Sequence, residues 1–114
     1  MTQHNDDINI KHMIEYARKA SNMTEGKQKS DLEKDEMLCL ALTRALEIIG
    51  EAASKLTPEF KAGQPHIPWT DIVGMRNRLT HGYFDIDLDR VWDTVMEDLE
   101  PLCVELEKLL DGIT

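Results

Sequence analysis

The stretch DEMLCLALTRALEIIGEAASKL, residues 35–56, decides the fold of this chain. Its apolar residues recur every three or four positions, which is the spacing of one face of an α-helix. The residues on that face are Leu38, Ala41, Leu42, Ala45, Leu46, Ile49, Ala52, Ala53 and Leu56. Gly50, Ala52 and Ala53 are small, which permits a neighbouring helix to approach closely. The stretch therefore predicts a long amphipathic helix packed against other helices.

Three charged residues, Arg44, Glu47 and Glu51, lie on the same predicted helix at spacings of three and four. Opposite charges at such spacings stabilise a helix by about 0.2–0.5 kcal/mol per pair. The row is therefore either a solvated set of ion pairs or the support of an interface.

Apolar residues with helical spacing also occur on both sides of this stretch. They predict helices over about residues 8–23, 68–81 and 87–110. Asp87 suits the N-cap of the last helix, and Pro68 suits the first position of the preceding one. We therefore expect four main helices.

The links between these helices are short or polar. Residues 21–34 are predicted to form a polar loop. Ser30 and Glu33 form a possible capping box, so the long helix begins anywhere from there to Asp35. A Thr-Pro pair opens residues 57–62 and predicts a short helical turn.

These elements predict an all-α fold, an antiparallel four-helix bundle with one short extra helical turn. A chain of 114 residues is long enough to bury one core, so we expect a single domain over residues 1–114. Pro101 should kink or split the last helix near Leu99, because proline lacks a backbone N–H and crowds the preceding turn. Cys39 and Cys103 are expected to be small buried hydrophobes.

The net charge is −9, with 22 acidic and 13 basic residues. Such a surface repels phosphate at long range, so bulk attraction to nucleic acid is excluded. Residues 1–7 lack the basic and apolar regions of a signal peptide. No apolar run approaches the length of about 20 residues that a membrane span requires. We therefore expect a cytoplasmic protein, and any chemistry on RNA or DNA would need a local basic pocket or a partner.

The segment RNRLTHGY, residues 76–83, concentrates the reactive side chains. On a helical wheel Arg76 falls in the middle of an apolar arc, whereas Arg78 points to the opposite side. An arginine on an apolar face is costly unless it is paired or faces a cleft or interface. His81 follows five residues later, and positions i and i+5 diverge by about 140° on a helix. The two side chains converge only if the helix ends or bends before His81, or if a second subunit supplies one of them.

Gly82 provides a means to end this helix at about residues 80–81, because glycine adopts the left-handed conformation of a helix C-terminus. The extended string Arg76-Asn77-x-Leu79-x-His81-x-Tyr83 resembles the HEPN superfamily, and within it the HepT-like toxins with their R-x4-H-x-Y motif. The similarity extends to residues 45–53, 67–75, 82–85 and 91–92, and covers about residues 8–110.

This resemblance implies an all-α bundle that dimerises and places two motifs across a shared cleft. It also implies a metal-independent ribonuclease that acts as a toxin. The implied antitoxin is a minimal nucleotidyltransferase (MNT), which transfers AMP to the motif tyrosine, here Tyr83, and so silences the toxin.

The chemistry of the motif residues agrees with that implication. His81 suits a general acid or base because its pKa lies near neutrality. Arg76 suits a bidentate grip on phosphate. Asn77 either orients His81 from one turn away or caps the helix end. AMP on Tyr83 would add bulk and negative charge that exclude RNA phosphate.

No cofactor and no metal site is expected. Asp85, Asp87 and Asp89 begin like a calcium loop, but Arg90 and Met96 stand where such a loop needs glycine and glutamate. These aspartates are better explained as an N-cap and a charge cluster. The alternative function is a catalytically silent helical module that binds a nucleotidyltransferase or a nucleotide, and the acidic surface favours it somewhat.

Overall fold

The computed structural model describes residues 4–81 and 87–113, and in that part of the chain all regular structure is helical. The elements in chain order are α1 (His4–Met23), α2 (Asp31–Lys34), α3 (Glu36–Ser54), α4 (Pro58–Ala62), α5 (Trp69–His81), α6 (Leu88–Asp93), the π-helical turn η1 (Thr94–Asp98) and α7 (Leu99–Ile113). The predicted all-α class is confirmed.

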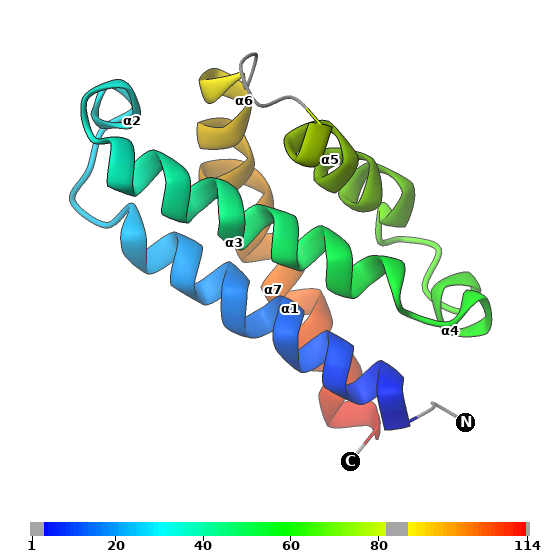
Figure 1. Cartoon of the computed structure of the whole chain (residues 1–114). Coiled ribbons are helices and arrows are strands. Elements are labelled where there is room, and N and C mark those ends of the chain that lie inside the picture. Colours follow the sequence, from blue (N-terminus) through cyan, green and yellow to red (C-terminus); the bar gives the residue numbers. More distant parts are fainter. Residues whose placement is uncertain (1–3, 82–86, 114) are drawn as a thin grey trace.

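Helix α3 lies between α1 and α5 and packs against both (Figure 1). The segments α6, η1 and α7 follow one another as a long rod that crosses behind α3 and packs against α1. Successive long helices run in opposite directions, which agrees with the predicted antiparallel bundle. The short helices α2 and α4 lie at the two ends of α3.

The start of α3 is capped by Asp35, whose Oδ1 accepts a hydrogen bond of 3.1 Å from the backbone N–H of Leu38. Ser30 has a helical backbone and makes no side-chain capping bond, so the capping box is not used. Helix α2 is a separate turn at Asp31–Lys34, within the range from Ser30 to Asp35 where the long helix was predicted to begin. Helix α1 begins at His4, four residues earlier than predicted.

The predicted turn after α3 is confirmed as α4. The hydroxyl of Thr57 accepts from the N–H of Phe60 at 3.3 Å, and Pro58 occupies the first helical position. Asp6, which is fully buried on α1, accepts from the backbone N–H of Thr57 at 2.9 Å and from its hydroxyl at 2.8 Å. This polar contact ties the start of α1 to the link between α3 and α4.

The expected disturbance by Pro101 takes the form of the π-helical turn η1, after which α7 begins at Leu99. The N–H of Leu99 bonds to the carbonyl of Thr94, five residues back. A proline ring crowds the carbonyl four residues before it, and for Pro101 that residue is Glu97, inside η1. The wider turn therefore accommodates the proline without separating α6 from α7.

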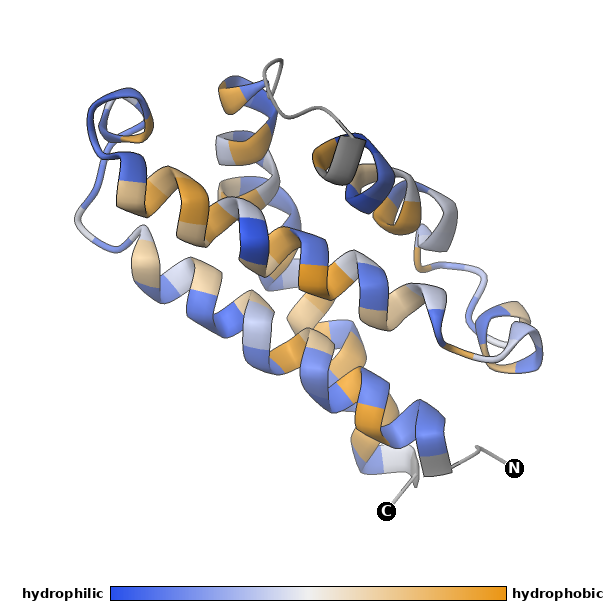
Figure 2. Ribbon diagram, in the orientation of Figure 1, coloured by the Kyte–Doolittle hydropathy of each residue, from blue (hydrophilic) through white to orange (hydrophobic). Residues whose placement is uncertain are grey.

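The core lies between the helices, and hydrophobic residues recur along α3 (Figure 2). The largest fully buried apolar side chains are Ile10, Met13, Leu32, Leu42, Leu46, Ile49, Leu99 and Leu106. Cys103 is buried as predicted, and burial raises the pKa of its thiol, whereas Cys39 is only half-buried. Among the described residues no helix combines the length and the apolar character needed to cross a membrane.

Candidate functional site

The candidate site lies at the C-terminal end of α5. Arg76 is half-buried and Asn77 is exposed there. His81 is the last residue of α5, and only its backbone is described. Tyr83, Gly82 and Asp85 lie outside the described residues.

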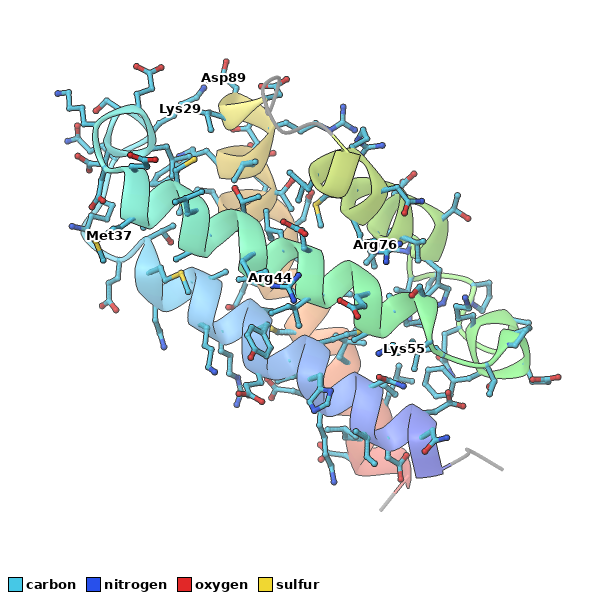
Figure 3. All side chains as sticks on the ribbon, viewed as in Figure 1. Lys29, Met37, Arg44, Lys55, Arg76 and Asp89 are labelled. Carbon is cyan, nitrogen blue, oxygen red and sulfur yellow. The ribbon has the colours of Figure 1, made fainter. Side chains whose placement is uncertain are left out.

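The predicted apolar arc of α5 is confirmed, because Trp69, Ile72 and Leu79 are each 9% exposed and belong to the core. Arg76 lies on the side of α5 that faces α3 (Figure 3). The arginine therefore occupies a seam between two helices and is only half-exposed to solvent.

Gly50 of α3 lies directly beneath Arg76. A Cβ atom built on Gly50 would fall 2.2 Å from Cβ of Arg76 and 3.1 Å from its Cγ. It would also fall 3.0 Å from the backbone carbonyl oxygen of Ile72. The missing side chain at Gly50 is thus what allows α3 and α5 to approach at this point.

The far end of the Arg76 side chain contacts its neighbour in sequence. Nη1 of Arg76 donates a hydrogen bond of 3.0 Å to Oδ1 of Asn77. Asn77 was predicted to orient His81 or to cap the helix, and this contact with the guanidinium is an additional one that the sequence did not predict. The predicted contact with His81 lies outside the described side chains.

Helix α5 stays helical through His81, so it does not end before that residue. The predicted end of the helix at residues 80–81 stays a prediction, because residues 82–86 lie outside the described part of the chain. Because α5 is continuous through His81, positions 76 and 81 lie about 140° apart around its axis. An early end of α5 therefore does not bring Arg76 and His81 together, which leaves a bend or a second subunit.

The charged row on α3 forms pairs along its own helix. Arg44 lies 3.6 Å from a carboxylate oxygen of Glu47, and Lys55 lies 3.7 Å from one of Glu51. Figure 3 shows Arg44 on α3, Lys55 directly after the end of α3 and Arg76 on the neighbouring α5. Carboxylates partly neutralise Arg44 and Lys55, and both side chains line a groove with residues of α1.

Arg78 is exposed on a different side of α5, as predicted. With Arg90 it lines a pocket of about 200 Å³ between α5 and α6, whose floor includes Met75, Leu79 and Val91. A wider hollow of about 450 Å³ around it is lined by Arg78, Arg90 and a larger number of aspartates, Asp71, Asp87, Asp89, Asp93 and Asp98. Their negative charge makes this hollow a poor site for an RNA phosphate.

Among the described side chains, no group of three or more histidines, cysteines and carboxylates is placed to hold a metal ion. Asp87 accepts from the N–H of Arg90 at 3.2 Å and caps α6, as predicted. Asp89 pairs with Lys29 at 2.9 Å. Two of the three residues that resembled the start of a calcium loop therefore have structural partners.

The sequence model of a protein family described as "Ribonuclease HepT-like" matches residues 13–109 of the chain. The chain belongs to the HepT-like ribonuclease family. This confirms the predicted likeness to the HEPN superfamily and assigns the protein to a family of RNA-cleaving enzymes.

Similar proteins agree with this assignment. A protein of Thermococcus cleftensis named "Probable ribonuclease HepT" is 44% identical over 75 residues, which are 66% of this chain and 68% of that protein. Two others carry provisional RNase names and are each 32% identical over 101 residues, or 89% of this chain. The match spans 90% of the protein from Caldanaerobacter subterraneus subsp. tengcongensis and 84% of the protein from Methanocaldococcus jannaschii. No solved structure matches this one.

Proposed function

We propose that this HepT-like protein is a metal-independent endoribonuclease toxin of a toxin–antitoxin pair. It acts in the cytoplasm as a homodimer of single-domain subunits. An MNT-type nucleotidyltransferase antitoxin neutralises it by transferring AMP to Tyr83. The observation that carries the proposal is the half-buried Arg76, held at the α3–α5 seam five residues before His81 in a ribonuclease family.

The proposed reaction uses the ribose 2′-hydroxyl of the substrate as the nucleophile. A base removes its proton, the 2′-oxygen attacks phosphorus, and the 5′-oxygen leaves after it accepts a proton. The products are a 2′,3′-cyclic phosphate and a 5′-hydroxyl. His81 supplies proton transfer, and Arg76 stabilises the charge that builds on the phosphorane oxygens. No metal is required, because these two side chains provide both functions.

Two observations support the homodimer. Helix α5 is continuous through His81, and positions five apart on a continuous helix lie about 140° apart around its axis, so a second copy can complete the site. The N-terminal half of α3 also leaves large apolar side chains in solvent, with Met37 82% and Leu40 62% exposed. Met37 and Leu40 are three residues apart, so they lie on one face of α3 and offer an apolar contact to a second copy.

Sedimentation at micromolar concentration tests this assembly. A dimer is the expected species, and Met37→Glu together with Leu40→Glu should shift it toward monomer while the far-UV circular dichroism is retained. A fully active monomer would exclude the shared site.

The proposed control by AMP rests on position in the sequence. Tyr83 follows His81 by two residues, and the other tyrosine, Tyr16, is half-buried on α1 near the Lys19 ammonium, 4.5 Å from its ring centroid. Incubation with the cognate nucleotidyltransferase and ATP should add AMP-sized mass increments to the peptide that contains Tyr83. Tyr83→Phe should abolish them, and increments that persist in this variant would refute the assignment.

The central experiment measures RNA cleavage by the purified protein in the presence of EDTA. Arg76→Ala and His81→Ala should each abolish cleavage, and Arg78→Ala should have a smaller effect because Arg78 lies in the acidic hollow. Expression without the antitoxin should arrest growth, and His81→Ala should relieve the arrest. Parental cleavage rates in both Arg76→Ala and His81→Ala would exclude this motif as the active site. If the parent protein neither cleaves RNA nor arrests growth yet binds the nucleotidyltransferase, the silent binding module is the correct function.

A further inference from the structure

Helices α3 and α5 come close together at Gly50, which lies beneath Arg76. The position is buried, and a Cβ atom there would meet Cβ of Arg76 at 2.2 Å. Real Cβ atoms essentially never approach another heavy atom within 3.0 Å, so the two helices would have to separate by about an ångström. One of the conflicting atoms, the carbonyl oxygen of Ile72, belongs to the backbone and cannot rotate away.

Helix stability does not explain the glycine at this position. Glycine is a poor helix former, and Gly50 lies well inside α3. The described glycines elsewhere on helices do not share its contact. A Cβ on Gly74 of α5 would meet only Nη1 of Arg78 at 3.5 Å, and one on Gly112 of α7 would meet nothing within 4 Å. Gly50 is therefore specific to the contact with Arg76.

We propose that Gly50 is a positioning residue for Arg76, which sets the depth at which the guanidinium meets the RNA phosphate. The proposal rests on the proposed ribonuclease function and assigns a role to a residue outside the motif. Gly50 supports the base of the Arg76 side chain, and Asn77 holds Nη1 at its tip by a 3.0 Å hydrogen bond. The side chain is thus located at both ends before substrate arrives, which is the preorganisation that charge stabilisation requires.

Gly50→Ala tests the proposal. The added methyl group should displace Arg76 outward, and a misplacement of about an ångström is expected to lower kcat/KM roughly 10²-fold. Gly74→Ala and Gly112→Ala are matched controls, because the same chemical change meets no close atom there. Both controls should retain parental kcat/KM. The substrate is a labelled RNA fragment that the parent protein cleaves, and circular dichroism verifies that each variant is folded.

A double-mutant cycle separates positioning from a general loosening of the fold. Affinity is measured for a 2′-deoxy analogue of the same RNA, which cannot form the 2′-oxygen nucleophile. Gly50→Ala should weaken binding more in the parent protein than in Arg76→Ala, which keeps the Cβ that contacts residue 50 but has no guanidinium to displace. A general structural effect would weaken binding equally in both backgrounds and would overturn the proposal.

Should Gly50→Ala fail to fold, the compensating variant Gly50→Ala/Arg76→Gly tests the same contact. Removing Cβ of residue 76 takes away the 2.2 Å conflict and leaves the 3.0 Å contact with the carbonyl oxygen of Ile72, so the double variant should be more helical than Gly50→Ala alone. No gain in helicity would show that another contact is decisive. The proposed function fails separately, if Arg76→Ala cleaves RNA at the parental rate. The positioning role fails if Arg76→Ala is inactive and folded Gly50→Ala is fully active.

Discussion

Leu46 and Gly50 lie one turn apart on α3, yet the two regions that they represent are built on opposite principles. The core around Leu46 is filled by large apolar side chains that are completely removed from solvent. At Gly50, the α3–α5 seam has no side chain on α3 and the charged, half-buried Arg76 on α5. The core is stabilised by the burial of apolar area. The contact at Gly50 buries less apolar area and holds a charged side chain.

This difference implies that stability and activity can be altered separately on the same helix. A core side chain contributes through transfer from water and close packing. Arg76 contributes little to either, because its guanidinium stays partly in solvent and bonds to the exposed Asn77. Substitutions in the two regions should therefore change different measured quantities.

The largest expected effect on stability is that of Leu46→Ala. Leu46 is 0% exposed, and truncating a buried leucine to alanine costs about 2–5 kcal/mol because it loses transfer energy and leaves a cavity. Urea unfolding should show this loss, while kcat/KM per folded molecule stays near the parental value. Arg76→Ala should show the reverse, with activity lost and a smaller change in the free energy of unfolding, because Arg76 is only half-buried and the variant keeps its Cβ. Parallel loss of stability in both variants would remove the distinction between core and seam.

The second prediction concerns the buried carboxylate that fastens α1 to the end of α3. Asp6→Ala leaves the backbone N–H and the hydroxyl of Thr57 without their acceptor. The loss of a buried hydrogen-bond acceptor costs about 1–3 kcal/mol. The free energy of unfolding should fall by that amount, and RNA cleavage should persist because the contact lies at α4, away from α5. As a comparison, Asp6→Asn retains one acceptor oxygen and should be less destabilised than Asp6→Ala.

The third prediction compares the two candidate caps of the second long helix. Asp35→Ala removes the side chain that accepts from Leu38 N–H and should cost about 1 kcal/mol. Ser30→Ala should leave stability unchanged, because Ser30 makes no side-chain capping bond. Equal losses in the two variants would show that both residues stabilise the start of α3 in solution.

The pair Ser30 and Asp35 also shows how far local sequence patterns reach. The periodicity of apolar residues predicted the four long helices, because residues three and four apart share a helix face whatever surrounds them. Local sequence also predicted the caps at Asp87 and Thr57, because a cap depends on neighbours only three residues away. The cap signals at Ser30 and Asp35 could not be ranked from the sequence, because each has a side chain and a spacing that suit a helix N-cap.

Contacts between distant residues could not be predicted in the same way. Asp6 and Thr57 are 51 positions apart, and nothing in either neighbourhood identifies the other. The small size of Gly50 predicted a close helix neighbour, but the sequence did not indicate that Arg76 would be the residue in contact. The wheel placed Arg76 on an apolar arc and so identified it as unusual, whereas its actual support is a tertiary contact between α3 and α5.

The smallest expected effect lies outside both regions, at the ion pair between Lys29 and Asp89. Nζ of Lys29 lies 2.9 Å from Oδ1 of Asp89 and joins the α1–α2 link to the start of α6. The hydrogen bond to Asp89, together with the charges of Asp89, Asp93 and Asp87, raises the pKa of Lys29 above its ordinary value of 10.5. Both side chains are solvent-exposed, so the pair should be weak and should weaken further as salt is added.

The raised pKa fixes the direction of the pH dependence. A lysine with a higher pKa in the folded state contributes stability that is fully present below the unfolded value of 10.5 and is lost as pH rises through the folded pKa. Lys29→Ala should therefore lower the urea midpoint slightly at neutral pH in low salt. The difference from the parent should disappear at high pH or high salt. Lys27→Ala, which changes another exposed lysine in the same link, is the control and should show no such difference. A Lys29→Ala effect that persists in high salt and above the folded pKa would mean that packing of the lysine stem, and not its charge, holds the link against α6.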